Sequence, residues 1–107
     1  MRWTWDPNKN RANKRKHSLS FETAQLVFRD PLAISRPDSS MGEERWQTVG
    51  VIGGVTVFVV HTWPEPDPRG GEEVGRIISA RKATSHERMA YEEGQLKPTY
   101  GETAGRD

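Results

Sequence analysis

Two basic segments of the chain carry the side chains whose chemistry is easiest to define. Residues 1–17 hold six Lys or Arg against one Asp, a net charge of +5, and residues 76–88 hold four against one Glu, a net charge of +3. If both segments lie on one face of the fold, they form a phosphate-binding surface; otherwise they are ordinary solvated surfaces. RNA cleavage suits such a surface, because the substrate supplies the attacking 2′-hydroxyl and the protein needs only an acid, a base and cations.

The second basic segment contains the main candidates for a catalytic site. We expect Arg76 and Arg81 to bind the scissile phosphate and to stabilise the transition state. On a regular strand the two-residue period puts them on opposite faces, so a β-bulge or a strong twist is needed to bring them together. Glu87 and Tyr91, one helical turn apart, are candidates for the base and for an orienting hydroxyl. The alternative is that Glu87 only caps its helix and that Tyr91 packs on the sheet.

His17 is the candidate for proton transfer in the first basic segment. It follows a run of cations in an exposed stretch, and an imidazole that titrates near neutral pH can act as an acid or a base. The alternative is that His17 caps the C-terminal end of a helix. His61 closes an apolar strand and is expected to be a hydrogen-bonded core residue. The cations assigned to RNA binding are Lys14, Arg15, Lys16, Lys82 and Arg88.

Other kinds of active site find little support in the sequence. The three His residues are far apart and form no metal-binding motif, so we expect neither a metal nor any other cofactor. A Gly-x-Ser-x-Gly motif is absent, and the Gly-Gly pairs lack the residues of a phosphate-binding loop. The chain has no Cys, which excludes disulfides and a thiol nucleophile.

Length and composition predict one small domain. With 107 residues, of which 33% are hydrophobic, the chain can form a single modest core. We place this domain at residues 1–94 and expect residues 95–107, which are polar, to form a weakly ordered C-terminal tail. Apolar runs are too short for a membrane helix and no secretory signal begins the chain, so we expect a cytoplasmic protein that does not enter a membrane.

The hydrophobic pattern of the first half indicates the elements that position His17. Residues 1–5 predict a strand, and residues 7–17 predict a polar helix with Pro at its first position. Residues 21–30 predict a second helix with an apolar stripe. Residues 32–35 are a possible short strand, followed by a polar turn around Pro37.

The second half of the chain indicates strands followed by one helix. Residues 45–52 and 55–63 predict two strands joined at a Gly-Gly pair, which is typical of a hairpin turn. Residues 64–71 predict a loop, residues 74–82 a further strand, and residues 85–93 a helix that begins with a capping box. This order predicts an α+β fold in which an antiparallel sheet is packed by two N-terminal helices and one C-terminal helix.

Several stretches spread along the chain are similar to one known family. They are Trp5-Asp6-Pro7-Asn8-Lys9, Lys16-His17, Ser20-Phe21-Glu22, Val27-Phe28-Arg29-Asp30-Pro31-Leu32, Gly42-Glu43-Glu44-Arg45-Trp46, Val59-Val60-His61-Thr62 and Arg76-Ile77-Ile78-Ser79-Ala80-Arg81-Lys82. Together they span roughly residues 3–93 and resemble the BrnT family of bacterial type II toxins, within the RelE-like ribonuclease superfamily.

The resemblance implies a RelE-like fold and a metal-independent endoribonuclease that cleaves RNA and inhibits translation. It also implies a BrnA-type antitoxin as partner, with operator DNA bound only through the toxin–antitoxin complex. The alternative is a catalytically weak module that serves mainly in antitoxin binding and operon control. The sequence departs from the family pattern at Ser18, where Gly is frequent, at Trp63, where a basic residue is common, and in the long, Pro-rich segment 64–73.

Overall fold

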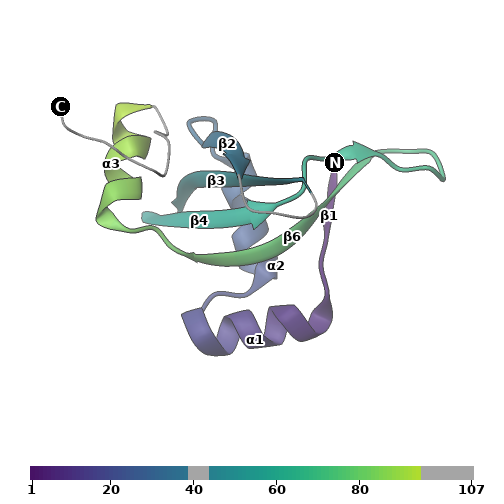
Figure 1. Ribbon diagram of the computed structural model, residues 1–107, viewed down its shortest axis with the longest axis horizontal. Helices are drawn as coiled ribbons and strands as arrows, with labels where there is room; N and C mark the ends of the chain where they lie inside the picture. Colours follow the sequence, from purple (N-terminus) through teal and green to yellow (C-terminus); the bar gives the residue numbers. More distant parts are fainter. Residues whose placement is uncertain (39–43, 95–107) are drawn as a thin grey trace.

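A mixed sheet of six strands forms the centre of the molecule (Figure 1). The computed structural model describes residues 1–38 and 44–94, so the predicted tail at 95–107 lies outside the described residues. The strands lie in the order β1 (Arg2–Thr4), β6 (Glu73–Lys82), β4 (Val55–His61), β3 (Arg45–Ile52) and β2 (Ile34–Asp38), and β5 (Glu65–Pro66) also pairs with β6.

The predicted α+β class is confirmed, with one strand in an unexpected direction. β1 runs parallel to β6, whereas the other strand pairs are antiparallel. A hairpin forces its two strands to be antiparallel, but β1 and β6 are separated by most of the domain. The intervening helices and strands let β1 join the sheet in either direction, which the local sequence pattern does not reveal.

Helix caps account for the first and last helices. α1 (Pro7–His17) begins after Asp6, whose side chain accepts a hydrogen bond from a backbone N–H of the first turn. α3 (Ser85–Glu93) has a complete capping box, in which Thr84 and Glu87 each bond to the other's backbone N–H. Both predicted helices are therefore confirmed.

The second predicted helix changes its winding partway along. α2 (Phe21–Ala24) is followed by a 3₁₀ segment, η1 (Gln25–Arg29), which ends at Asp30. The residue before a proline disfavours helical geometry, and Pro31 follows Asp30, which accounts for the end of the segment. The predicted apolar stripe is buried all the same, because Phe21, Ala24 and Val27 are fully inaccessible to solvent.

Two loops that the sequence predicts differ from the structure, and one turn agrees. The Gly53-Gly54 turn is confirmed, with both residues at positive φ, as a primed hairpin turn requires. The turn predicted around Pro37 is wrong, because Pro37 lies within β2. Pro is tolerated there since β2 is an edge strand, where a backbone donor can be missing. The predicted loop at 64–71 contains the two residues of β5.

The two faces of the sheet are covered differently. On the helix face, α2 and η1 lie against the sheet (Figure 1). Phe21 and Val27 from these segments share a core cluster with Val59 of β4. On the other face, Phe58 of β4 and Val60 form a second cluster, which α3 contacts at one end of the strands. We call this second side the arginine face, because it carries Arg81, whose guanidinium lies 4.1 Å from the centroid of the Phe58 ring.

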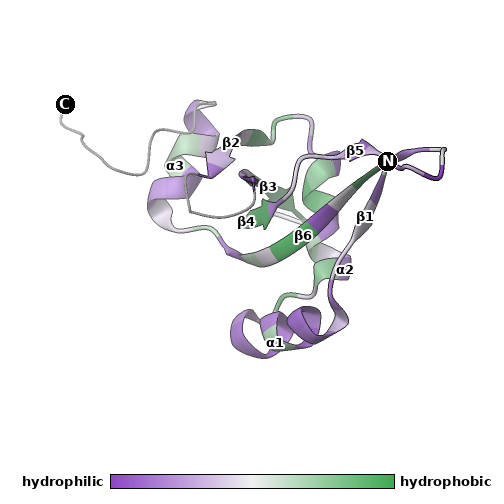
Figure 2. Cartoon of the chain, turned by 45° about the vertical axis from the view of Figure 1, so that its right-hand side comes forward, coloured by the Kyte–Doolittle hydropathy of each residue, from purple (hydrophilic) through white to green (hydrophobic). Residues whose placement is uncertain are grey.

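α1 lies along the β6 edge of the sheet and is held there by one buried amide. Asn13 donates from Nδ2 to the Ala80 carbonyl at 2.7 Å and accepts from the Ala80 backbone N–H at 3.2 Å. The side chain thus takes the place of a neighbouring strand and closes this edge. Figure 2 shows that α1 is otherwise hydrophilic nearly all round, as the sequence predicts.

α1 ends in a left-handed residue that a side chain disfavours. Ser18 has φ 57° and donates its backbone N–H to the Lys14 carbonyl. This conformation is the one that Gly adopts most easily at the end of a helix. The departure from the family pattern at Ser18 therefore leaves the exit from α1 intact at the cost of local strain.

Candidate functional site

A β-bulge in β6 brings the two predicted phosphate-binding arginines to the same face. Val60 of β4 pairs with Ser79, and the next residue, His61, pairs with Ile77, so that β6 has one extra residue at this point. Ile77 and Ala80 consequently both belong to the core of the helix face, although they are three residues apart. Arg76 precedes Ile77 and Arg81 follows Ala80. Because neighbouring residues of a strand point to opposite faces, both arginines lie on the arginine face.

Arg81 is held in place by a carboxylate and an aromatic ring. Its Nη1 donates to Glu87 Oε1 at 2.9 Å and its Nη2 donates to Oε2 at 3.0 Å, so the pair is bidentate. The guanidinium stacks over the ring of Phe58, and its side chain remains 35% exposed. A guanidinium fixed in this way keeps further N–H donors for an anion that approaches from solvent.

Glu87 is committed to the charged form by its contacts. Burial alone would raise its pKa, but the hydrogen bonds from Arg81 and from the Thr84 backbone outweigh burial, and the pKa of Glu87 lies below its usual value. A carboxylate with a lowered pKa is a weak proton acceptor. These contacts favour a role in orienting Arg81 over the predicted role as the base.

Beside Arg81 lies a row of four residues, three of them polar, that the sequence pattern did not reveal. Arg36 of β2 pairs with Gln47, which pairs with Val60, which pairs with Ser79, so these four residues form a row across the arginine face. Arg36 Nε donates to Gln47 Oε1 at 2.7 Å. Burial lowers the pKa of Arg36, and the charge of nearby Glu87 opposes that effect.

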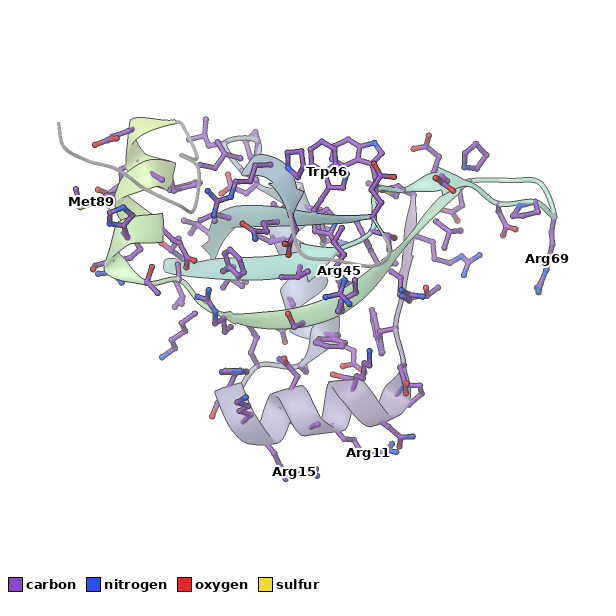
Figure 3. The ribbon with its side chains drawn as sticks, in the orientation of Figure 1. Arg11, Arg15, Arg45, Trp46, Arg69 and Met89 are labelled. Carbon is purple, nitrogen blue, oxygen red and sulfur yellow. The ribbon has the colours of Figure 1, made fainter. Side chains whose placement is uncertain are left out.

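The alternation along β2 could have revealed this row. Ile34, Arg36 and Asp38 occupy alternate positions of one strand, but the expectation of a turn at Pro37 ended the predicted strand too early. Arg45 of β3 lies two residues from Gln47 and belongs to the same face (Figure 3). The arginine face therefore carries more cations than the two predicted ones.

Tyr91 connects α3 to the turn that follows η1. Its hydroxyl donates to Asp30 Oδ2 at 2.6 Å, and the same oxygen accepts the Val51 backbone N–H at 2.8 Å. The hydrogen bond to Asp30 raises the pKa of Tyr91, while the bonds from Tyr91 and Val51 lower the pKa of Asp30. Tyr91 also packs against the cluster that contains Phe58. Its contacts thus hold α3, and with it Glu87, against the sheet.

The first basic segment does not converge with the arginine face. Figure 3 shows Arg15 of α1 pointing away from the sheet. Lys14 and Lys16 are exposed on the same helix, and His17, its last residue, is half-buried. Lys82 pairs with Val57, whose side chain belongs to the core of the helix face, so Lys82 is also turned away from Arg81.

Arg88 lies at the start of α3 and is exposed, with its guanidinium 3.4 Å from the Ala83 carbonyl. Arg88 therefore lies on the same helix as Glu87 and directly follows it in the sequence, unlike the cations of α1. The predicted RNA-binding residues thus fall into separate groups on α1, on β6 and on α3. A substrate that contacts all of them must extend around the β6 edge.

His61 is the buried core residue that the sequence predicts. It is 1% exposed, and burial lowers its pKa, so the imidazole is neutral. Its Nδ1 lies 2.7 Å from the Thr62 carbonyl, which can only accept, and Nε2 lies 2.6 Å from Thr48 Oγ1. Nδ1 therefore carries the proton, and Nε2 accepts from the Thr48 hydroxyl.

Within residues 1–38 and 44–94, no group of three acidic or imidazole side chains lies close enough together to hold a metal ion. In the same part of the chain, no helix has the length and apolar character needed to cross a membrane.

Comparison with known proteins agrees with the resemblance seen in the sequence. A search of curated proteins returns no match. The model of one family, described as "Ribonuclease toxin, BrnT, of type II toxin-antitoxin system", matches residues 5–87. This range contains α1, the whole sheet from β2 to β6 and the Arg81–Glu87 pair. Because the match covers most of the chain, the protein belongs to the BrnT family of ribonuclease toxins.

Proposed function

We propose that this protein cleaves RNA without a metal ion and that the arginine face is its active site. The observation that carries the proposal is the bidentate Arg81–Glu87 pair above Phe58, on a sheet face to which the bulge also brings Arg76. Membership of a ribonuclease toxin family supports RNA as the substrate. Inhibition of translation in the cytoplasm follows as the cellular effect of this cleavage.

The reaction requires charge stabilisation more than it requires a special nucleophile. The 2′-oxygen of the substrate attacks the adjacent phosphorus and gives up its proton to a base, while the bond to the 5′-oxygen breaks and that oxygen takes a proton from an acid. The products are a 2′,3′-cyclic phosphate and a 5′-hydroxyl. Arg81 and Arg76 stabilise the negative charge that develops on the phosphate oxygens.

The other predicted residues receive supporting roles in this proposal. Glu87 orients Arg81 through both carboxylate oxygens, and Tyr91 holds α3 through Asp30. His17, which the sequence predicts for proton transfer, ends α1 away from the arginine face, and we therefore assign it to RNA binding with the cations of that helix. Lys14, Lys16 and the neighbouring cations of α1 bind the RNA backbone away from the scissile phosphate.

Control of the toxin requires that its cationic surface be covered. We propose that a BrnA-type antitoxin binds the arginine face with an acidic or apolar segment, since an uncovered face would bind RNA. Operator DNA is then contacted through the antitoxin in the complex. The family description, which places the toxin in a type II toxin–antitoxin system, supports an antitoxin as partner.

Incubation of the purified protein with total RNA in EDTA tests the proposal. We expect cleavage in EDTA, and products that end in a 2′,3′-cyclic phosphate and a 5′-hydroxyl. Cleavage that stops in EDTA, or products with 5′-phosphates, would contradict the mechanism. Absence of cleavage with and without divalent metal, by protein that still binds the antitoxin, would favour the weak binding module instead.

A further inference from the structure

Arg36 is a half-buried cation on the same sheet face as Arg81. It lies on β2, the outermost strand, and β3 and β4 separate it from β6. Its Nε donates to Gln47 Oε1 at 2.7 Å, which restrains the guanidinium. Within residues 1–38 and 44–94 this is the only hydrogen bond of the Arg36 side chain, so both terminal amino groups keep their N–H donors for a ligand.

The charge of Arg36 is partly removed from water and has no direct ion pair in the described part of the chain. No carboxylate there forms a salt bridge with it. Burial lowers the pKa of Arg36, and the charges of Glu87 and Asp38 oppose this effect through space. Desolvation of a charge without a contact partner costs free energy. Such a group is typical of a site whose ligand supplies the countercharge.

Glu87 relates the position of Arg36 to that of Arg81. Its carboxylate pairs with both amino groups of Arg81, at 2.9 Å and 3.0 Å, and the same charge acts on Arg36. Two guanidiniums thus lie on either side of the middle strands, one from β2 and one from β6. Guanidinium groups match the oxygens of phosphate, and phosphates recur along an RNA strand.

We propose that Arg36 binds the phosphate that flanks the scissile one and that Gln47 positions its guanidinium. This inference rests on the proposed function, which assigns RNA to the arginine face. Neighbouring strands lie about 4.8 Å apart, so the backbones of β2 and β6 are separated by roughly 14 Å. The RNA strand then crosses the sheet from β6 toward β2, and Arg36 contributes to binding while Arg81 and Arg76 act on the scissile phosphate.

Equilibrium binding of RNA that cannot be cleaved tests this proposal without catalysis. The probe is a 2′-O-methyl oligouridylate, whose blocked 2′-oxygen cannot attack the phosphate. Arg36→Met should weaken binding about tenfold. It should also lower the slope of log affinity against log salt by about 0.7, the value for one phosphate contact on a single strand. In cleavage assays the same variant should raise KM more than it lowers kcat.

Arg69→Met is the matched control for the loss of one positive charge. Figure 3 shows Arg69 at the tip of the loop between β5 and β6, where its side chain points away from the sheet. This variant should bind the probe as the parent does. Equal losses in Arg69→Met and Arg36→Met would show a general effect of net charge and would overturn the assignment of Arg36.

The positioning role of Gln47 is tested in a double variant. Gln47→Leu removes the acceptor of the Arg36 Nε–H, so it should weaken binding in the parent but have no further effect in Arg36→Met. Thermal melting of each preparation gives the folded fraction to which the affinity refers. A merely structural Gln47 would lower the melting temperature and leave the affinity of the folded protein unchanged, which would overturn its positioning role.

The remaining outcomes separate this inference from the proposed function. Equal binding by Arg36→Met and the parent overturns the inference and leaves RNA cleavage at Arg81 in place. A parent that neither binds the probe nor cleaves RNA removes both. A loss seen with oligouridylate but absent with 2′-O-methyl oligoadenylate would assign Arg36 to a base, because phosphate contacts carry no sequence information.

Discussion

Two polar clusters lie on opposite faces of the same sheet. They differ in charge and in whether all their side-chain donors have hydrogen-bond acceptors within the protein. The cluster around His61 is neutral, Thr48 and His61 are both buried, and each side-chain donor in it has an acceptor within the protein. The cluster around Arg81 is charged, and the Arg81 side chain is 35% exposed. A neutral, fully bonded cluster stabilises the fold, whereas a charged cluster that keeps free donors at the surface can act on a substrate.

The comparison also shows why residue type alone does not identify a catalytic group. His61 has the side chain most often used in acid–base catalysis, yet burial lowers its pKa and its nitrogens both have protein partners. Arginine is not an acid–base catalyst, yet the partly exposed position of Arg81 is the reason that we propose it for phosphate chemistry. Environment, more than residue type, separates the two.

The largest expected effect comes from removing the cation of the exposed cluster. Arg81→Ala should lower the single-turnover cleavage rate by roughly 10²–10³-fold, the usual loss when one transition-state donor is removed. The variant should still fold, but its melting temperature should fall, because the mostly buried Glu87 carboxylate loses its ion-pair partner. Met89→Ala serves as the control for an exposed substitution. A variant that folds and cleaves at the full rate would remove Arg81 from the active site.

The opposite result is expected for the buried cluster. His61→Leu leaves the Thr48 hydroxyl without its acceptor and should destabilise the protein by about 1–3 kcal/mol. Cleavage per folded molecule should be unchanged. Urea unfolding and single-turnover cleavage on the same preparation measure both quantities. Loss of cleavage with normal stability would show that the His61 cluster acts on the substrate, which contradicts its assignment to fold stability alone.

The pH dependence of stability should separate the clusters further. The pKa of His61 is lowered in the folded state, so its contribution to stability is present above the ordinary value of 6.5 and is lost as the pH falls below it. The lowered pKa of Glu87 acts in the same direction but only below about 4.5. In urea unfolding across this range, His61→Leu should remove the first decline, and Glu87→Gln should reduce the second, to which the lowered pKa of Asp30 also contributes. A first decline that persists in His61→Leu would contradict the assignment.

The smallest effect is expected on α1, which belongs to neither cluster. Changing Lys14, Arg15 and Lys16 together to Gln should weaken RNA binding and reduce the slope of log affinity against log salt by at most about 2. His17→Ala should leave turnover intact, because α1 lies away from the arginine face, and a loss of turnover larger than the loss of binding would identify His17 as the proton-transfer group after all. If His17 only caps the helix, the variant will lose about 1 kcal/mol of stability and keep its turnover.

The local pattern predicted the elements that are determined by neighbouring residues. The Asp6 cap, the capping box at Thr84 and the Gly53-Gly54 hairpin each depend on a few adjacent residues, and all three are present. The parallel direction of β1 and the extension of β2 through Pro37 depend on strands that are distant in sequence. Such pairings leave little trace in local periodicity.

The same distinction holds for the candidate site. Arg81 and Glu87 are six residues apart, and their proximity follows from a strand that leads directly into a capped helix. Arg36 reaches this region only through the register of four strands, and sequence reasoning missed it. The need for a bulge between Arg76 and Arg81 was predictable, whereas its position opposite Val60 and His61 was not.

The comparison of single-turnover cleavage rates between Arg81→Ala and the double variant Arg81→Ala/Glu87→Gln tests the central claim most directly. The claim is that the arginine face cleaves RNA through Arg81 and that Glu87 acts by orienting it. If so, Glu87→Gln alone lowers the rate, but it has no further effect once Arg81 is absent, and the two variants cleave at rates within about twofold of each other. A further loss in the double variant as large as that of Glu87→Gln in the parent would contradict this account and identify Glu87 as an independent catalytic group.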